Sequence, residues 1–566
     1  MHKRWCAINW ERTIICLAVI AMGACLAGNI YGFYIMPDEY TYWAYAAYYA
    51  GYDWSETVAL GPYFSYGYAF LLYPVFITFN NPVMAYRVAI WINIFILLLV
   101  YALLIKIGKS ALTEENENMT VYAAVSIFFP CYFFYAQTTM AETLILLLYV
   151  VVCRLMQKYL ENNSVVTLVV LIVVMMYLYI VHMRTVGVLV SALFVLLPYF
   201  GQIKNGKKHL ALCIMLSGFM FICANALKDR SYHELYAGIN PEFVIENDYG
   251  GQLDKIKYLF NIDGLYDFVV GLSGKVLYLG LASFGLFYFG VIRLIRNAKK
   301  KIFSLETFII MTVVSQIGIS ALYLLTFREI SDYTYGRYNE FVLSMPMIYG
   351  LCEVREIVRG KKYKKIALSL TLISVMQLIV TVMVVRQTIK TNAGVFQGFF
   401  ITGISYLYDE SNFSVAGFYT TAYLFLTALM LAVFFLIGLS NLGTRRIVMY
   451  GIVVIEMCLT LRLYQVYMKP YRVGIFRDIS IAEEICRLND NGYTVYYLDS
   501  IYPASIGIIQ FLKRELPLHV IYDKQYEPVP GEKTLYIMDY EDARYEQWKQ
   551  EYKHYDIYGH FAILYD

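Results

Sequence analysis

Residues 13–43 read TIICLAVIAMGACLAGNIYGFYIMPDEYTYW, an apolar run that passes directly into a tyrosine-rich loop with two adjacent carboxylates, Asp38 and Glu39. The apolar part has about the 17 to 25 residues that a helix needs to cross a hydrocarbon core. No small-x-small cleavage pattern follows it, so we expect a retained membrane anchor and not a removable signal peptide. Similar runs recur along the 566-residue chain, which therefore predicts a polytopic integral membrane protein.

The composition also indicates that the bilayer is the solvent. Hydrophobic residues make up 59% of the chain and charged residues 16%, and the mean hydropathy is +0.53; a soluble fold of this size could not bury so much apolar surface. The net charge of +3 is the small difference between 46 basic and 43 acidic residues, so it provides no argument for a nucleic-acid partner. The many Lys, Ile and Tyr residues favour a low-GC bacterial source.

About thirteen apolar runs are long enough to cross a membrane. They begin near Thr13, Ala85, Thr120, Glu142, Val165, Thr185, Leu210, Lys275, Leu305, Phe341, Ile366, Ala416 and Ile447. If the runs alternate in direction, the linkers rich in lysine and arginine all fall on one side: 2–4, 106–109, 154–158, 204–208, 293–301, 355–365 and 445–446. The positive-inside rule makes that side cytoplasmic and places the amino terminus there.

The opposite, outer side receives most of the acidic and aromatic loop residues, in segments 35–84, 227–274, 327–340, 388–415 and everything after about residue 469. An odd number of spans also accounts for a soluble carboxy-terminal segment on that side. A miscount of one weak span, such as 62–80, would reverse this placement, and the charge pattern argues against it. We therefore expect a transmembrane domain over 1–468 and an extracytoplasmic domain over 469–566.

The outer domain is predicted to be a small α/β unit. Short β-rich runs alternate there with helical stretches, in the order 479–488, 494–498, 505–515, 518–522 and 534–538. It contains no glycine-rich nucleotide loop and no evident catalytic constellation, so a lid or recognition module is the favoured interpretation. Of the ten cysteines only Cys486 lies there, and no Cys or His cluster has ligand spacing, which predicts neither a disulfide framework nor zinc.

Three carboxylates are the main catalytic candidates. Asp38 and Glu39 follow the first span and Glu142 opens the fourth, so all three are expected at the outer membrane boundary. Ionised groups at membrane depth cost about 2.5 to 3.5 kcal/mol on insertion scales, so carboxylates that face protein here are functional candidates. Asp38 could also cap an interfacial helix that begins near Pro37, and the two roles are compatible.

Cations on the same side could form an anion site suited to a phosphate. Arg337 lies in the tyrosine-rich segment 332–340 directly before a span, where a planar guanidinium can bind phosphate or stack on a sugar. Arg184 lies in a short loop with apolar flanks, so snorkelling to the lipid interface is an equally good interpretation. The remaining candidates are Lys228, Arg230, Lys275 and Arg328.

Together these features resemble the GT-C superfamily of membrane glycosyltransferases, in particular the protein mannosyltransferase and aminoarabinose transferase branch, glycosyltransferase family 39-like. The matching segments are Asp38-Glu39, the aromatic stretch 61–68, the stretch 135–142 that leads into the fourth span, and Gly336-Arg337-Tyr338. The likeness covers most of the membrane region and is strongest over 30–200. The chain departs from the aminoarabinose transferases in having Tyr40-Thr41-Tyr42, with no basic residue close behind the acids, so their phosphate contacts near this loop do not carry over.

The resemblance implies a GT-C-like, all-α membrane fold and an inverting transfer of a sugar from a polyprenyl-phosphate carrier to a glycan, lipid or protein acceptor at the outer face of the plasma membrane. Asp38 and Glu39 are then the expected catalytic residues. A carboxylate that takes the acceptor proton contributes about 10² to 10⁴ in rate, and Asp38 is the expected base. The leaving phosphate needs charge stabilisation more than an acid.

Glu39 and Glu142 would then hold sugar hydroxyls or a divalent metal, although the outer loops lack a clear D-x-D motif and no obligatory cofactor is expected. The full set of expected substrate contacts is Glu142, Arg184, Arg328, Arg337, Tyr338 and Tyr63.

Three alternatives remain. A transporter or flippase of lipid-linked sugars also needs many spans, but transporters usually place charges near mid-bilayer and show internal repeats, whereas here the ionisable groups collect at one face. A polysaccharide polymerase or ligase with a diphosphate-linked donor would share the outer-face site. A nonenzymatic scaffold leaves the placement of Asp38 and Arg337 unexplained.

Overall fold

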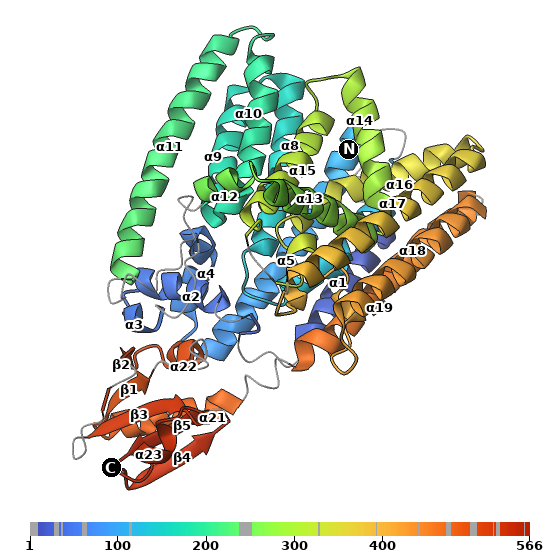
Figure 1. The fold of residues 1–566 in the computed structure, drawn as a ribbon. Coiled ribbons are helices and arrows are strands. Elements are labelled where there is room, and N and C mark those ends of the chain that lie inside the picture. The colour runs from blue at the N-terminus through green and yellow to red at the C-terminus, as the bar shows by residue number, and fades with distance from the viewer. Residues whose placement is uncertain are drawn as a thin grey trace.

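The computed structural model describes residues 9–27, 33–35, 38–58, 65–112, 116–236, 252–326, 329–391, 393–439, 442–470, 477–498, 506–523, 526–527, 533–559 and 561–566. A large helical bundle carries a small α/β domain at one end, and short helices lie between the two (Figure 1). The expected architecture, an all-α membrane region with a small carboxy-terminal sheet domain, is confirmed.

Within the described ranges, ten helices are long and apolar enough to cross a membrane. They are α1 (Trp10–Ala27), α5 (Pro82–Ala111), α8 (Glu142–Asn162), the 3₁₀ turn η3 (Met183–Thr185) with α10 (Val186–Phe200), α11 (Gly206–Leu235), α13 (Ile262–Ala282), α15 (Leu305–Tyr323), α17 (Tyr363–Lys390), α18 (Val415–Leu439) and α19 (Leu442–Leu463). α6 (Met119–Ile127) and α7 (Pro130–Ala136) add an eleventh span if the pair, bent by 60°, is counted as one. Two further apolar runs are shorter helices, α9 (Val165–Val181) and α16 (Ser344–Arg359).

Each of the thirteen apolar runs found in the sequence coincides with one of these helices, and the eighth differs most from expectation. The sequence predicts its start near Lys275, whereas α13 begins at Ile262 and is followed by a separate helix, α14 (Leu286–Lys300). Phe284 and Gly285 stand at the break with φ of 51° and 79°. The left-handed backbone there ends α13, which lies across the bundle, and starts α14, which stands along it (Figure 1).

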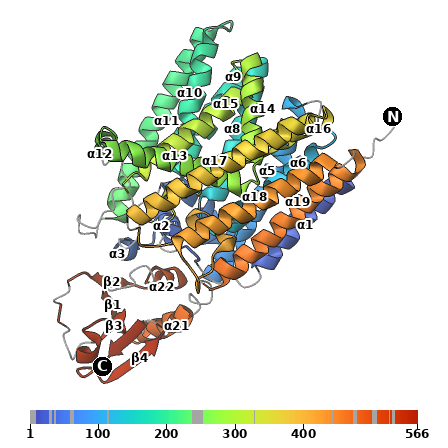
Figure 2. The same cartoon turned by 45° about the vertical axis from the view of Figure 1, so that its right-hand side comes forward.

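A reciprocal glycine contact brings α14 and α16 together. A Cβ at Gly290 would lie 2.0 Å from the carbonyl oxygen of Pro346, and one at Gly350 would lie 2.2 Å from the carbonyl oxygen of Leu286. Small residues let membrane helices approach closely, and packing is what joins them because lipid offers no hydrophobic drive for association. Next to α16, helices α17, α18 and α19 lie side by side (Figure 2).

Short helices cover the end of the bundle that meets the carboxy-terminal domain: α2 (Asp38–Tyr49), α3 (Ser55–Val58), η1 (Tyr66–Tyr68) and α4 (Ala69–Thr78). Rings hold them together, since Tyr40 stacks on Trp54 at 5.5 Å between centroids and the Trp54 ring meets Phe76 edge to face at 5.8 Å. Such pairs add about 0.5 to 1.5 kcal/mol each beyond their burial. α2 is therefore fixed by packing along most of its length.

The carboxy-terminal domain contains a five-stranded mixed sheet in the order β2-β1-β3-β5-β4. Its strands are β1 (Thr494–Leu498), β2 (Leu518–Ile521), β3 (Thr534–Asp539), β4 (His554–Tyr558) and β5 (Phe561–Tyr565). β1 pairs in parallel with β2 and β3, and β5 pairs antiparallel with β3 and β4. α21 (Arg477–Asp490) and α22 (Ile506–Leu512) pack on one face and α23 (Tyr545–Trp548) on the other.

The α22 end of this domain docks on the short helices. Phe511 lies 5.1 Å from the Trp43 ring of α2. The indole N–H of Trp54 donates to the carbonyl oxygen of Arg514 at 3.0 Å, and the Arg514 guanidinium covers the Phe76 ring at 3.8 Å. The domain thus contacts the helix that begins with Asp38.

Candidate functional site

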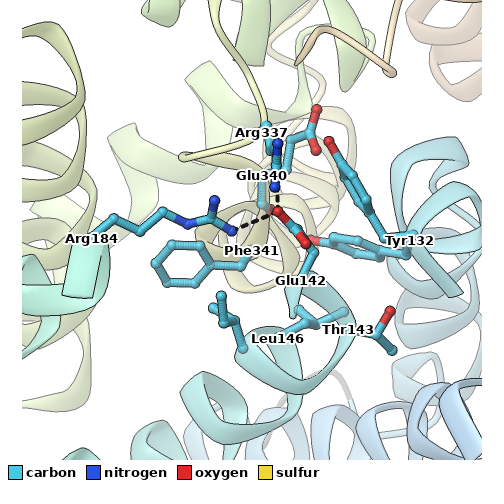
Figure 3. Close-up of a pocket in the computed structure, with 10 residues that line it drawn as sticks. Tyr132, Glu142, Thr143, Leu146, Arg184, Arg337, Glu340 and Phe341 are labelled. Carbon is cyan, nitrogen blue, oxygen red and sulfur yellow. Dashed lines mark hydrogen bonds and ion pairs between the residues drawn. The ribbon is translucent and has the colours of Figure 1, made fainter. Parts of the chain in front are cut away.

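Four charged side chains from distant parts of the chain form one series of ion pairs: Asp38 at the start of α2, Glu142 at the start of α8, Arg184 in η3, and Arg337 in the loop before α16. Arg337 Nη1 donates to Asp38 Oδ2 at 2.8 Å, and Arg337 Nε donates to Glu142 Oε1 at 2.5 Å. Arg184 Nη2 donates to the same Glu142 oxygen at 2.9 Å. One carboxylate oxygen therefore joins two guanidinium groups (Figure 3).

The ion pairs are buried, and Asp38 is the most accessible member. The exposed fraction is 4% for the Arg337 side chain, 6% for Arg184, 7% for Glu142 and 16% for Asp38. Opposite charges attract more strongly in such surroundings than in water, and buried charges require partners. Burial raises the pKa of the Asp38 carboxyl, and the Arg337 guanidinium opposes that rise.

Backbone contacts fix the position of Arg337. The N–H groups of Gly336 and Arg337 both donate to the carbonyl oxygen of Phe400, at 2.8 and 3.0 Å. A Cβ at Gly336 would lie 2.0 Å from a ring carbon of Tyr278, so only glycine permits this approach. The conformation of the loop, set by these contacts, directs the guanidinium into the bundle.

Arg184 is turned into the protein. Its guanidinium carbon lies 4.7 Å from the centre of the Tyr338 ring, a cation–π geometry. The side-chain amide of Gln316 on α15 donates to the carbonyl oxygens of Arg184 and Tyr338 at 3.1 and 3.0 Å, which ties the two arginine-bearing loops together. The alternative that Arg184 snorkels to the lipid interface is therefore wrong, because the side chain is buried and paired with Glu142.

Glu39 occupies a different environment from its neighbour Asp38. Its carboxylate is fully buried and accepts five hydrogen bonds of 2.6 to 2.8 Å, from the N–H groups of Tyr34, Ile35 and Thr139 and the hydroxyls of Tyr86 and Thr139. Consecutive helix residues point about 100° apart, which separates the two acids. The saturated carboxylate of Glu39 joins α2 to α5 and to the turn before α8.

A small pocket lies against the ion pairs and contains several buried polar atoms without a partner. Its lining includes Tyr132, Thr143, Glu340 and Phe341 together with the charged side chains of Glu142, Arg184 and Arg337 (Figure 3). Within the part of the chain that the structure describes, five lining atoms have no hydrogen-bond partner: Glu142 Oε2, Thr143 Oγ1, Arg184 Nε, Arg184 Nη1 and Glu340 Oε2. Buried polar groups are normally satisfied, so this set is suited to a polar ligand.

The remaining sequence candidates lie elsewhere or are not described. Tyr63 and Arg328 lie outside the described residues. Arg230 is exposed and pairs with Glu234 at 3.1 Å, and the buried Lys275 donates to the carbonyl oxygen of Asp332 at 3.0 Å, so neither lines the pocket. Sequence analysis missed Gln316, Thr143 and Glu340 as site residues; Glu340 stood inside the segment 332–340, which was selected for its arginine alone.

The charges of the site favour an anion over a metal ion. Among the described residues no group of three or more His, Cys, Asp or Glu side chains is placed to hold a metal. The two acids of the site face guanidinium groups, which donate hydrogen bonds and never ligate a cation. Arginine pairs are well suited to phosphate because the planar fork presents several donors.

No family model matches the sequence, and no curated protein matches it. Among solved structures, the fold is similar to that of ArnT from Cupriavidus metallidurans in the apo state, with a TM-score of 0.55 and 11% identity over 98% of this chain and 97% of that one. The same protein bound to undecaprenyl phosphate aligns with a TM-score of 0.55 and 10% identity over 99% and 98% of the two chains. An oligosaccharyltransferase from Archaeoglobus fulgidus aligns with a TM-score of 0.44 and 11% identity, over 90% of this chain and 64% of that one.

The likeness to ArnT extends over the membrane bundle and the carboxy-terminal domain. It confirms the expected GT-C-like fold and, with the ten long apolar helices among the described residues, a multi-pass membrane protein. Because only 10 to 11% of the aligned residues are identical, the comparison with ArnT shows a similar fold and no more.

Proposed function

We propose that this protein is an inverting glycosyltransferase that moves a sugar from a polyprenyl-phosphate carrier to an acceptor at the outer face of the membrane. The observation that carries the proposal is the buried series Asp38–Arg337–Glu142–Arg184, which borders a pocket with unused guanidinium donors. The fold supports it, since ArnT has been solved with undecaprenyl phosphate. The sugar and the acceptor are left open.

Arg184 and Arg337 are the proposed phosphate ligands. The Nε and Nη1 groups of Arg184 are buried, and no described residue accepts from them. A phosphate oxygen that reaches either donor in the pocket gains a charge-assisted hydrogen bond. As the glycosidic bond breaks, negative charge grows on that phosphate, so donors fixed in advance stabilise the transition state. Tyr338 holds the Arg184 guanidinium in place.

Asp38 is the proposed base. It is the most exposed of the four charged groups, and its Oδ2 is held by Arg337. The same guanidinium thus lies between the proposed base and the pocket that would hold the phosphate. Glu142 sets the spacing of the two arginines, and its free oxygen Oε2 is placed to accept from a sugar hydroxyl. For Glu39, whose carboxylate is saturated, we propose a positioning role in place of the expected catalytic one.

The proposed topology has the amino terminus in the cytoplasm and the carboxy-terminal domain outside. The distribution of Lys and Arg over the linkers supports it. The carboxy-terminal domain docks on α2 and α3, next to the helix that begins with Asp38, so the site and the domain share one side of the membrane.

Turnover in lipid nanodiscs tests the function. Wild type supplied with polyprenyl-phosphate sugars should release free polyprenyl phosphate, and Asp38→Asn should lower that release by about 10² to 10⁴ while donor binding persists. Asp53→Asn is the matched control, because Asp53 is an exposed acid in the same outer loop whose side chain, among the described residues, accepts from the backbone N–H of Ser55. If Asp38→Asn releases polyprenyl phosphate as fast as wild type does, Asp38 is not the base. Turnover with diphosphate-linked donors alone favours a polymerase or ligase, and sugar-lipid translocation without release favours a transporter.

A further inference from the structure

Glu340 is a buried acid at the edge of the pocket, and the proposed chemistry does not use it. It begins the 3₁₀ turn η7 (Glu340–Leu343) that leads into α16, and its side chain is 2% exposed. It lines the same pocket as Glu142, Arg184 and Arg337 (Figure 3). Burying a carboxyl group costs folding free energy, so a buried acid beside the pocket is a candidate for a role in ligand binding.

The two oxygens of Glu340 have different surroundings. Oε1 accepts hydrogen bonds from the Tyr278 hydroxyl and from the Thr402 hydroxyl, the latter at 3.1 Å. The Tyr278 oxygen itself accepts from the N–H of Gly403 at 2.8 Å, so its own proton is directed to Oε1. Oε2 is buried, and no residue in the described ranges bonds to it. If Glu340 carries a proton, Oε2 is the oxygen that bears it.

The described groups that face Glu340 are hydroxyl and thiol groups and one carboxylate. Tyr278 comes from α13, Cys131 and Tyr132 from α7, Thr402 from the loop before η9 (Ser405–Leu407), and Glu142 from α8. No lysine or arginine of the described residues forms an ion pair with Glu340, and Arg337, in the same loop, is engaged by Asp38 and Glu142. Burial raises the pKa of Glu340 to about 7, and the negative charge of Glu142 adds a smaller contribution, while hydrogen bonds from Tyr278, Cys131 and Thr402 oppose the rise.

We propose that Glu340 is a proton-bearing recognition residue, whose Oε2–H donates a hydrogen bond to the phosphate of the donor lipid beside the two arginines. The inference rests on the proposed function, because it concerns how the same pocket holds a phosphate. A neutral acid adds a donor without adding charge, whereas its carboxylate form places an anion against the phosphate and repels it. Binding of an anionic donor therefore favours the protonated form and weakens when that proton is lost.

The sign of the pH dependence follows from linkage. A group whose pKa lies at about 7 is protonated below that pH and loses its proton above it, so donor affinity is highest on the acid side. If only the protonated form binds, the dissociation constant rises about tenfold between about pH 6 and about pH 8.

The test uses farnesyl methyl phosphate, a prenyl phosphodiester whose single charge does not change in this pH range. Its dissociation constant is measured on the full chain in nanodiscs across about pH 5.5 to about pH 8.5, for wild type, Glu340→Gln and Glu329→Gln. Glu329 is the matched control, since burial raises its pKa to about 7 as well but it lies outside the pocket. Wild type and Glu329→Gln should show the tenfold loss, while Glu340→Gln, which keeps a donor at every pH, should bind with a flat profile.

Each outcome of the binding measurement supports or overturns the proposed role of Glu340. A flat wild-type profile, or a Glu340→Gln profile with the wild-type slope, overturns the role of Glu340 and leaves the transferase proposal intact. Absence of binding by wild type and both variants overturns the proposed function and this inference together. A second measurement compares the infrared spectra of wild type and Glu340→Gln. The C=O band of a protonated carboxylic acid that Glu340→Gln lacks should persist in wild type near neutral pH when the phosphodiester is bound and disappear on raising the pH without it. Wild type without this difference band when the ligand is bound also overturns the proposal.

Discussion

Adjacent carboxylates at positions 38 and 39 take opposite roles because a helix turns them to different sides. Asp38 faces the ion-paired pocket, while Glu39 accepts five hydrogen bonds inside the protein. We therefore expect Glu39→Gln to destabilise the fold, since its amide NH₂ would point at hydrogen-bond donors, and to lower the free energy of unfolding by about 2 to 4 kcal/mol.

The check on Glu39 is the midpoint of thermal unfolding in nanodiscs, followed by tryptophan fluorescence. Glu39→Gln should lower the midpoint, whereas Asp38→Asn should lower it less, because Arg337 keeps Glu142 as a partner, and should affect turnover. A Glu39→Gln variant that keeps both its midpoint and its activity would show that the hydrogen bonds around the carboxylate contribute little.

Arg337 contacts two carboxylates at once, through Nη1 and Nε. A lysine carries the same charge on one nitrogen and cannot reproduce this fork, so Arg337→Lys should reduce kcat/KM by about 10². Lys390→Arg is the converse control on an exposed cation that pairs at 3.6 Å with Asp263, and it should have no effect on turnover. Steady-state kinetics of donor consumption measures this effect. If Arg337→Lys keeps the wild-type kcat/KM, a positive charge at this position is sufficient and the guanidinium fork is not needed.

The sequence alone identified most of the charged residues of the site, but not the separate roles of Asp38 and Glu39, and not Glu340. Asp38 and Glu142 were selected because an acid at the outer boundary that faces protein is a functional candidate, and Arg184 and Arg337 because cations on the same side could form an anion site. In the structure the four side chains meet. The difference between Asp38 and Glu39 depends on helix phase and on donors up to 100 positions away, which no local pattern contains. Glu340 was missed because its burial depends on Tyr278 and Thr402, which come from other parts of the chain.

At the scale of the element, hydropathy predicts where helices occur and says little about how they break. All thirteen apolar runs are helical because each must satisfy its backbone hydrogen bonds internally in lipid. Backbone geometry produces two of these breaks. α6 and α7 are bent by 60° relative to each other where α7 begins at Pro130, and α13 is separated from α14 at Phe284, which has a positive φ. These are the places where the predicted boundaries differ from the structure.

The crossing of α14 and α16 is the element-scale feature that supports the site, because α16 follows directly from the turn that carries Glu340. Gly350→Val would place branched carbon atoms against the backbone of Leu286, where even a Cβ would lie 2.2 Å from its carbonyl oxygen. We expect the helices to be forced apart, with a lower unfolding midpoint and loss of donor binding. Gly318→Ala on α15 is the control, since a Cβ there meets nothing within 4 Å, and it should behave as wild type. A stable, active Gly350→Val variant would show that the crossing can shift without disturbing the loop.

At the scale of the whole molecule, the question is whether the carboxy-terminal domain only covers the site or also positions α2. Its α22 end meets α2 through Phe511 and Trp43, and Arg514 contributes both a cation–π contact with Phe76 and a 2.7 Å hydrogen bond to the Phe76 carbonyl oxygen. Arg514→Ala removes about 1 to 3 kcal/mol from this docking. Since Asp38 begins α2, looser docking should raise amide hydrogen exchange in α2 and α3 and lower turnover several-fold.

Hydrogen exchange read by mass spectrometry separates the two roles of the domain. Arg487→Ala is the control, because among the described residues Arg487 forms an ion pair with Glu484 alone, within α21, and it should change neither exchange in α2 nor turnover. If Arg514→Ala raises exchange in α22 and also in α2, docking of the outer domain stabilises the helix that carries the proposed base. If exchange rises in α22 alone and turnover is unchanged, α2 is held by its own aromatic packing and by Glu39, and the domain acts only as a cover.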